Sequence, residues 1–155
     1  MKKLFFTFFI MLFVACHPAA SKKPKALTIT YKDLNGLEVS LSDYKGKKVL
    51  VNYWATWCGP CIKEMPALLK AQEILKESNF VFLLVSDESV EKISNFKSGT
   101  AYDFNFLKLT GSMDLLGIYA LPTTYIYNEK GEEIKKIIGS VIWDSKEMIQ
   151  ILKDI

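Results

Sequence analysis

Apolar residues along this chain follow two patterns, one typical of buried strands and one typical of helices. Residues 49–54 form a nearly continuous apolar run and residues 79–86 form another, as expected for strands covered on both faces. Between them, residues 62–76 carry apolar side chains at intervals of three and four, with lysines and glutamates placed to face water. The pattern therefore predicts an α/β fold built on a central sheet.

Shorter segments of strand-like composition predict further strands. Asn35-Gly36 separates the first two segments and is a hairpin signal, so we expect an N-terminal β-hairpin. The turn at residues 128–131 separates the last two segments and predicts a second hairpin. The predicted strands are residues 27–31, 37–41, 104–109, 123–127 and 133–138.

Capping residues predict three helices after the central strands. Ser89 is placed to cap the first of them, and Ser112 is placed to cap a brief helix over residues 113–119. The spacing of Asp144 to Glu147 makes a capping box, which predicts that the last helix starts at Asp144.

The first 15 residues predict an export signal. Two lysines precede the apolar run 4–14, which is too short to span a bilayer comfortably and is typical of the core of a signal peptide. The run ends in Phe13-Val14-Ala15-Cys16, which resembles a bacterial lipobox. We therefore expect Cys16 to be lipidated and to become the mature N-terminus on a membrane. Ordinary signal cleavage nearby, with Cys16 left free or lost, is the alternative.

The chain is then divided into three parts. Residues 1–15 are the expected signal peptide, and residues 16–26 are the lipidated cysteine and a tether without hydrophobic periodicity. Residues 27–155 are expected to form one domain, because 155 residues, half of them hydrophobic, suffice for one full core. This predicts an extracytoplasmic, periplasm-facing domain held off a bacterial membrane.

The composition excludes several classes of function. All 20 basic residues are lysines and the net charge is only +3, so no basic patch indicates a nucleic-acid partner. The single histidine is His17, in the expected tether, which makes a hydrolase with a catalytic histidine a poor fit. Two neighbouring cysteines and a distant histidine are too few ligands for zinc, so we expect no metal. No nucleotide or flavin fingerprint occurs, and we expect no cofactor.

A Cys-x-x-Cys motif lies between the run 49–54 and the helix 62–76. Cys58 and Cys61 can close a small disulfide ring at the start of this helix, whose N-terminus favours a thiolate on Cys58. This arrangement indicates dithiol redox chemistry. If Cys16 carries lipid, these two cysteines are the one pair that the chain has.

Three sequences stand in a characteristic order along the chain: Trp57-Cys58-Gly59-Pro60-Cys61, Pro66 five places after the second cysteine, and Leu121-Pro122-Thr123-Thr124 before a late strand. Together they resemble the thioredoxin superfamily, and more narrowly the TlpA/ResA-like extracytoplasmic thiol-disulfide oxidoreductases. The resemblance runs from about residue 27 to the C-terminus. It implies a thioredoxin-like α/β fold with a central mixed β-sheet flanked by helices, an N-terminal β-hairpin and a TlpA-type insertion.

The resemblance also implies roles for the two cysteines. Cys58 is expected to be the exposed nucleophile that attacks a disulfide of a partner protein, and Cys61 the resolving thiol that then closes the ring. Gly59-Pro60 resembles the pair found in reducing thioredoxins, so we expect reduction of disulfides in exported proteins. A static structural disulfide is the alternative, although so small a ring adds little constraint to the chain.

Further site residues follow from the same resemblance. Pro122 matches a cis-proline that lies beside the cysteines and presents the backbone of Leu121 to an extended substrate, and an ordinary trans proline is the alternative. Trp57 is expected to shield the disulfide and to form part of the docking surface. Glu64 matches a glutamate expected to tune the thiol pKa values or relay protons, unless it is a solvated helix residue. Asn52 stands where thioredoxin itself carries a buried aspartate, and an amide cannot take the proton of the resolving thiol.

The resemblance suggests partners as well. A membrane thiol-electron donor would supply the electrons, and apocytochrome c is one client that it suggests. A peroxiredoxin-like peroxidase is an alternative, but its typical site pairs the cysteine with an arginine, which this chain lacks. A non-catalytic thioredoxin-like module that binds client proteins is another.

Overall fold

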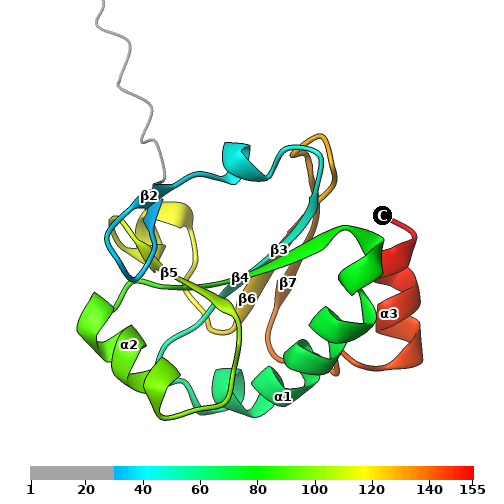
Figure 1. Ribbon diagram of the computed structural model, residues 1–155. Helices are drawn as coiled ribbons and strands as arrows, with labels where there is room; N and C mark the ends of the chain where they lie inside the picture. The colour runs from blue at the N-terminus through cyan, green and yellow to red at the C-terminus, as the bar shows by residue number, and fades with distance from the viewer. Residues whose placement is uncertain (1–29) are drawn as a thin grey trace, which may run out of the picture.

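One seven-stranded mixed sheet runs through the computed structural model, which describes residues 30–155 (Figure 1). The strand order is β2-β1-β5-β4-β3-β6-β7. The three middle strands β5, β4 and β3 are parallel, and the outer strands pair antiparallel with their neighbours. The strands are β1 (Tyr31–Lys32), β2 (Glu38–Val39), β3 (Lys48–Tyr53), β4 (Phe80–Ser86), β5 (Asn105–Leu109), β6 (Thr123–Tyr127) and β7 (Glu133–Ile138).

The strands β3 and β4 lie at the centre because most of their residues are apolar and buried. They pair in parallel, with Val51 opposite Leu83. Since successive side chains of a strand point to opposite faces, Leu50 and Trp54 belong to one hydrophobic cluster, and Val49 and Val51 belong to another. The prediction of central strands covered on both faces is confirmed.

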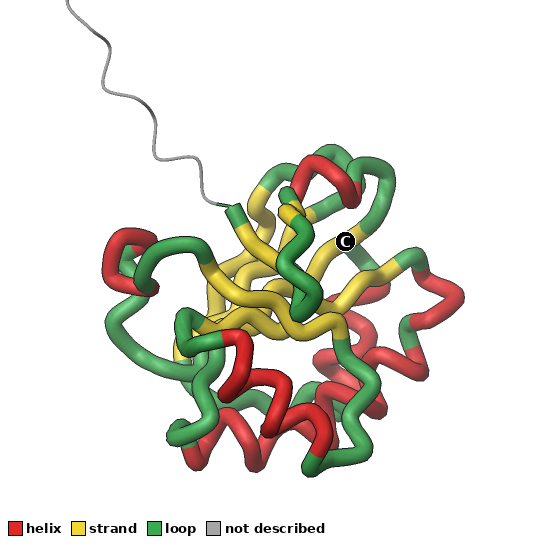
Figure 2. The backbone as a smooth tube through the Cα atoms, turned by 60° about the vertical axis from the view of Figure 1, so that its left-hand side comes forward, coloured by secondary structure: helices red, strands yellow, loops and turns green. Residues whose placement is uncertain are grey.

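Three α-helices cover one face of the sheet (Figure 2). Their buried side chains, among them Met65, Ile93 and Leu152, pack on the cluster that contains Leu50 and Trp54. The N-terminal hairpin and two short 3-10 helices cover the opposite face. The helices are α1 (Gly59–Ile74), α2 (Val90–Ser98) and α3 (Lys146–Lys153), and the 3-10 helices are η1 (Leu41–Tyr44), η2 (Lys76–Ser78) and η3 (Met113–Leu116).

Both predicted hairpins are present. The second has the predicted bounds, since it consists of β6 and β7. In the first, the Asp33 carboxylate accepts hydrogen bonds from the backbone N–H groups of Asn35 and Leu37, which closes the turn between β1 and β2. The strand β1 is shifted toward the turn relative to the predicted segment 27–31, of which residues 27–29 lie outside the described residues.

The structure corrects two of the predicted helices. The segment after Ser112 forms only the 3-10 helix η3, because Gly117 takes a left-handed conformation with φ 67° that a continuing helix cannot contain. The last helix begins later than predicted, because Ser145 rather than Asp144 is its N-cap and accepts the N–H of Met148 at 3.2 Å. Asp144 instead pairs with Lys70 of α1 at 3.3 Å.

The predictions for the N-terminal segment fall outside the described residues. They are the signal peptide at 1–15, the lipidated Cys16 and the tether at 16–26. Within residues 30–155, no helix combines the length and the apolar character needed to cross a bilayer.

Candidate active site

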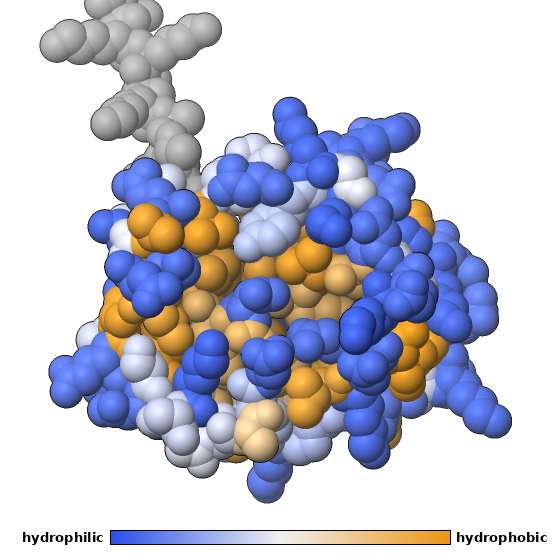
Figure 3. All heavy atoms as spheres, in the orientation of Figure 1, coloured by the Kyte–Doolittle hydropathy of each residue, from blue (hydrophilic) through white to orange (hydrophobic). Residues whose placement is uncertain are grey.

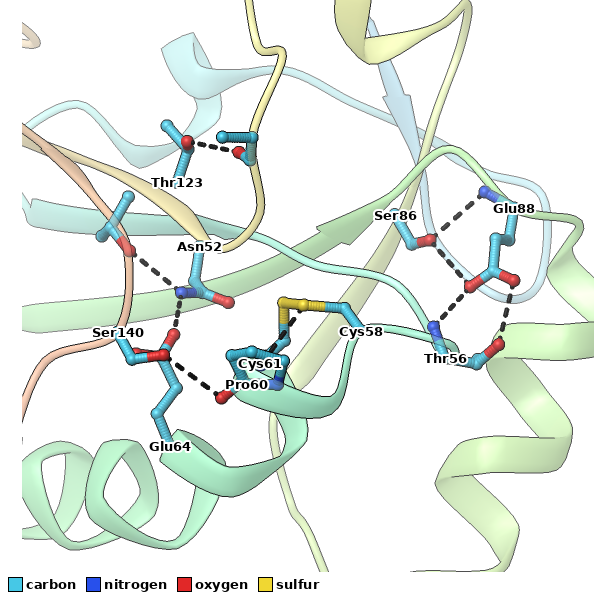
Figure 4. The surroundings of a disulfide bond; sticks show 12 residues. Asn52, Thr56, Cys58, Pro60, Cys61, Glu64, Ser86, Glu88, Thr123 and Ser140 are labelled. Carbon is cyan, nitrogen blue, oxygen red and sulfur yellow. Dashed lines mark hydrogen bonds between the residues drawn. A yellow bond between two sulfur atoms is a disulfide. The ribbon is translucent and has the colours of Figure 1, made fainter.

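The two cysteines form a disulfide where β3 leads into α1. Cys58 is the N-cap of α1 and Cys61 lies in its first turn, with their Cα atoms 5.3 Å apart and their sulfurs bonded (Figure 4). The backbone N–H of Cys61 points at the sulfur of Cys58, at 3.3 Å. The helix therefore directs a backbone donor at the first cysteine, where it can stabilise negative charge on that sulfur.

The disulfide is more shielded than the sequence led us to expect. Cys58 is 4% exposed and Cys61 is 1% exposed, so Cys58 is the more accessible of the two but is not an exposed residue. The neighbouring Trp57, in contrast, is 73% exposed. The disulfide is therefore mostly covered, while the residue directly before Cys58 is open to solvent.

Glu64 is a buried residue with three hydrogen-bond partners, not a solvated helix glutamate. It is 5% exposed, and its Oε1 accepts a hydrogen bond from Asn52 Nδ2 at 2.9 Å. Its Oε2 accepts two more, from the backbone N–H of Val141 at 3.1 Å and from Trp143 Nε1 at 3.0 Å. Glu64 lies one turn after Cys61 on α1, so this carboxylate is held beside Cys61.

Burial governs the electrostatics of this carboxyl group. Loss of hydration raises the pKa of Glu64 above its ordinary value, and the hydrogen bonds from Val141, Asn52 and Trp143 oppose part of that increase. A hollow of about 340 Å³, lined by Glu64, Lys63 and Val141 among others, lies between α1 and the loop after β7. The carboxyl group thus borders a path by which it can exchange protons with water.

Asn52 connects Glu64 to the strand β6. The residue is 1% exposed, and its Nδ2 donates to Thr124 Oγ1 at 2.9 Å as well as to Glu64. In Figure 4 the Asn52 amide lies between the Glu64 carboxylate and the disulfide. The amide therefore belongs to the same buried polar group as Glu64.

A second carboxylate holds the loop that precedes the cysteines. Glu88 accepts the backbone N–H of Thr56 at 2.6 Å and the Thr56 hydroxyl at 2.9 Å. It also pairs with Lys92 at 3.5 Å. The loop carrying Trp57 is thereby fastened to the start of α2, about thirty positions away.

Two of the three predicted docking residues, Trp57 and Leu121, lie along one groove. The Leu121–Pro122 peptide bond is cis, as the resemblance implied, and Leu121 packs against the cluster that contains both cysteines. Trp57 and Leu121 line a groove of about 490 Å³ together with Tyr119, which is 85% exposed. Hydrophilic side chains cover most of the face shown in Figure 3, with apolar patches between them. The structure thus brings Trp57 and Leu121 together beside the disulfide.

Several partners in the site could not be read from the sequence. Trp143 and Val141 lie in a loop without periodicity, and Glu88 belongs to no motif. Thr124 belongs to the Leu121-Pro122-Thr123-Thr124 motif, but nothing in that motif predicted its hydrogen bond with Asn52. Among residues 30–155, no three histidine, cysteine or acidic side chains lie together as they would around a metal ion. Cys16 lies outside the described residues.

The fold and the cysteine pair define the class of protein. A thioredoxin-like sheet with a disulfide at the N-terminus of its first helix is the arrangement of a thiol-disulfide oxidoreductase. The chain belongs to the AhpC/TSA family, whose model matches residues 23–136.

Individual relatives agree with this class. The chain is 34% identical over 123 residues to the thiol-disulfide oxidoreductase ResA of Bacillus cereus, which covers 76% of this chain and 68% of ResA. It is 41% identical over 133 residues to the thioredoxin-like protein YneN of Bacillus subtilis, covering 83% and 76% of the two chains. The crystal structure of the pneumococcal exposed lipoprotein thioredoxin Etrx1 of Streptococcus pneumoniae matches with a TM-score of 0.62 and 31% identity, over 81% of this chain and 98% of that one. The expected fold and enzyme class are confirmed.

Proposed function

We propose that this protein reduces disulfides of exported proteins through the Cys58–Cys61 pair. The observation that carries the proposal is the position of this pair, at the N-terminus of α1 and beside the groove lined by Trp57 and Leu121. A purely structural disulfide would need neither the groove nor the buried carboxylate of Glu64 next to it.

The reaction begins from the dithiol form. The Cys58 thiolate, stabilised by the N–H groups of the first turn of α1, attacks one sulfur of a client disulfide and releases the other client sulfur as a thiolate. Cys61 then loses its proton and attacks the Cys58 sulfur of the mixed disulfide. The second client thiolate leaves, so two electrons pass to the client and the Cys58–Cys61 disulfide is restored.

Glu64 is proposed to serve the second step. Its pKa is raised by burial, which brings the carboxyl group closer to the pH range in which the thiols must exchange protons. We expect Glu64→Gln to change the pKa values of the two thiols and to slow insulin reduction. Unchanged thiol pKa values and an unchanged rate would remove this role and leave only a structural one.

The groove is proposed to hold the client. An extended segment would pair with the backbone at Leu121-Pro122, while Trp57 covers the mixed disulfide from the other side. The exposed rings of Trp57 and Tyr119 offer apolar contact area without a rigid pocket, which fits a protein that accepts more than one client.

The N-terminal sequence supports a proposed location outside the cytoplasm. The apolar run 4–14 and the lipobox-like end at Cys16 support export and lipid attachment, with residues 16–26 as a tether. The similar Etrx1 is named an exposed lipoprotein. A membrane thiol-electron donor would return the pair to the dithiol form, and the TlpA/ResA resemblance supports apocytochrome c as one client.

Insulin reduction tests the proposal. The dithiol form should precipitate insulin B chain, and both Cys58→Ser and Cys61→Ser should abolish turnover. Insulin binding that is unchanged in both variants, without any turnover in the wild type, would indicate a client-binding module. Peroxide consumption by the wild type would indicate a peroxidase, although this chain has no arginine to pair with a peroxidatic cysteine.

The direction of electron flow needs its own measurement. Dithiols of the reducing kind have potentials near about −270 mV, and strong oxidants lie near about −120 mV. Equilibration of the protein with glutathione buffers should give a value close to the first. A value close to the second would make the protein an oxidant of its clients. The variant Cys61→Ser should also trap the natural client as a mixed disulfide for identification.

A further inference from the structure

The buried amide of Asn52 has one unused hydrogen-bonding atom. Both hydrogen-bond distances of its Nδ2, to Glu64 Oε1 and to Thr124 Oγ1, are 2.9 Å. Its Oδ1 is buried and has no hydrogen-bond partner among the described residues. The reverse orientation of the amide would place this oxygen against the Glu64 carboxylate, so the observed orientation is the favourable one when Glu64 is ionised.

The unused oxygen faces the disulfide. Alternate residues of β3 place Leu50, Asn52 and Trp54 on the side covered by α1, in or beside the cluster that contains Cys58 and Cys61. Asn52 contacts Glu64, which lies one turn after Cys61 on the same helix. Figure 4 shows the Asn52 oxygen pointing toward the two sulfurs.

We propose that Asn52 Oδ1 accepts a hydrogen bond from the thiol of Cys61 in the reduced protein and thereby stabilises the dithiol relative to the disulfide. Reduction by a donor dithiol breaks the bond between the two sulfurs, adds two electrons and two protons, and leaves the donor as its own disulfide. One proton comes to lie on Cys61, which becomes a donor. The sulfur of the disulfide has no proton to donate, so the buried oxygen is satisfied only after reduction.

Asn52 is in this view a positioning residue that acts on the redox equilibrium. A buried acceptor without a partner costs about 1–3 kcal/mol, and reduction removes that cost. The inference rests on the proposed function in one respect: the Cys58–Cys61 pair must cycle between the disulfide and the dithiol. It gives Asn52 a role at the position where thioredoxin itself carries a buried aspartate. An aspartate there could take the proton of the Cys61 thiol, whereas an amide can only accept a hydrogen bond from it.

The variant Asn52→Leu tests the inference because leucine is similar in size and cannot accept a hydrogen bond. In equilibrium with glutathione buffers, the full-length variant should favour the disulfide by about tenfold more than the wild type, which equals about 30 mV for a two-electron couple. Two controls leave the Asn52 oxygen in place. Thr124→Val removes the other partner of Nδ2, and Trp143→Phe removes one hydrogen bond of Glu64. Both should stay within about threefold of the wild type.

An equilibrium constant that does not move in Asn52→Leu, or that moves equally in Thr124→Val, overturns the inference. Should Asn52→Leu not fold, the infrared S–H band of Cys61 decides, measured in a full-length chain with Cys16→Ser and Cys58→Ser. A band lowered in frequency relative to a free thiol supports the hydrogen bond, and a free-thiol band overturns it. If the wild type reduces insulin and Asn52→Leu leaves the equilibrium constant with glutathione unchanged, only this inference is refuted. A shifted constant without insulin reduction would refute only the proposed function.

Discussion

Trp143 Nε1 donates a hydrogen bond to Glu64 Oε2 at 3.0 Å, although the two residues lie 79 positions apart. Trp143 is fully buried in the loop before α3, and Glu64 is on the buried face of α1. The bond therefore joins the C-terminal part of the chain to the helix that carries the two cysteines. It also helps to hold the Glu64 carboxylate where its other oxygen accepts the hydrogen bond from Asn52.

Replacement of Trp143 with phenylalanine should destabilise the protein. The ring that remains fills most of the space, so the main loss is a hydrogen bond to a charged group, which is worth about 2 kcal/mol. Because the hydrogen bond lowers the pKa of Glu64, its removal should raise that pKa further. Urea unfolding of the oxidised protein measures the first effect, and titration of the Glu64 carboxyl carbon by NMR measures the second. A stability equal to that of the wild type would mean that the indole N–H contributes nothing.

The stability of the protein should depend on pH through Glu64. Its pKa is raised from the ordinary 4.5 in the folded state, so the folded protein binds this proton more tightly than the unfolded chain does. That stabilisation is fully present below the unfolded pKa and is lost as the pH rises through the folded pKa. The free energy of unfolding of the wild type, minus that of Glu64→Gln, should therefore fall as the pH rises above about 4.5. If the difference between the wild type and Glu64→Gln stayed constant as the pH rose, the folded structure would not hold the Glu64 proton more tightly than the unfolded chain.

Loss of Glu88 should loosen the loop before the cysteines. Glu88→Ala removes the acceptor of both the N–H and the hydroxyl of Thr56, and we expect a loss of about 1–3 kcal/mol in stability. The N–H of Thr56 should exchange with deuterium at least tenfold faster. Glu91→Ala, an exposed position on α2, is the matched control. Exchange that is equally slow in both variants would show that other contacts hold the loop.

Truncation of Trp57 should affect protein clients rather than folding. The side chain is 73% exposed, so Trp57→Ala should change the stability by less than about 0.5 kcal/mol. With insulin the KM should rise several-fold, because a client would lose contact area beside the disulfide. With oxidised glutathione, which is too small to use the groove, the rate should change little. Leu37→Ala, at a similarly exposed apolar residue in the first hairpin, should alter neither rate, and an equal loss for both substrates would argue against a docking role for Trp57.

The order of elements and the reactive pair follow from local patterns in the sequence. Alternation, helical spacing and turn residues predicted the strands β6 and β7 with their observed bounds, because these signals depend on near neighbours only. The cap of the last helix shows the limit of such signals, since Asp144 and Ser145 are both good caps. A contact with Lys70, far away in the chain, engages Asp144 instead.

The sequence by itself determined that two cysteines stand at the start of a helix that follows a buried strand, and this suffices for the class of chemistry. Only the tertiary structure decided what surrounds them. From the sequence, Glu64 could equally face water as the neighbouring Lys63 does, whereas folding buries it against Asn52 and Trp143. Such contacts join residues 12 and 79 positions apart, so they depend on how the sheet and helices pack and not on any local preference of the chain.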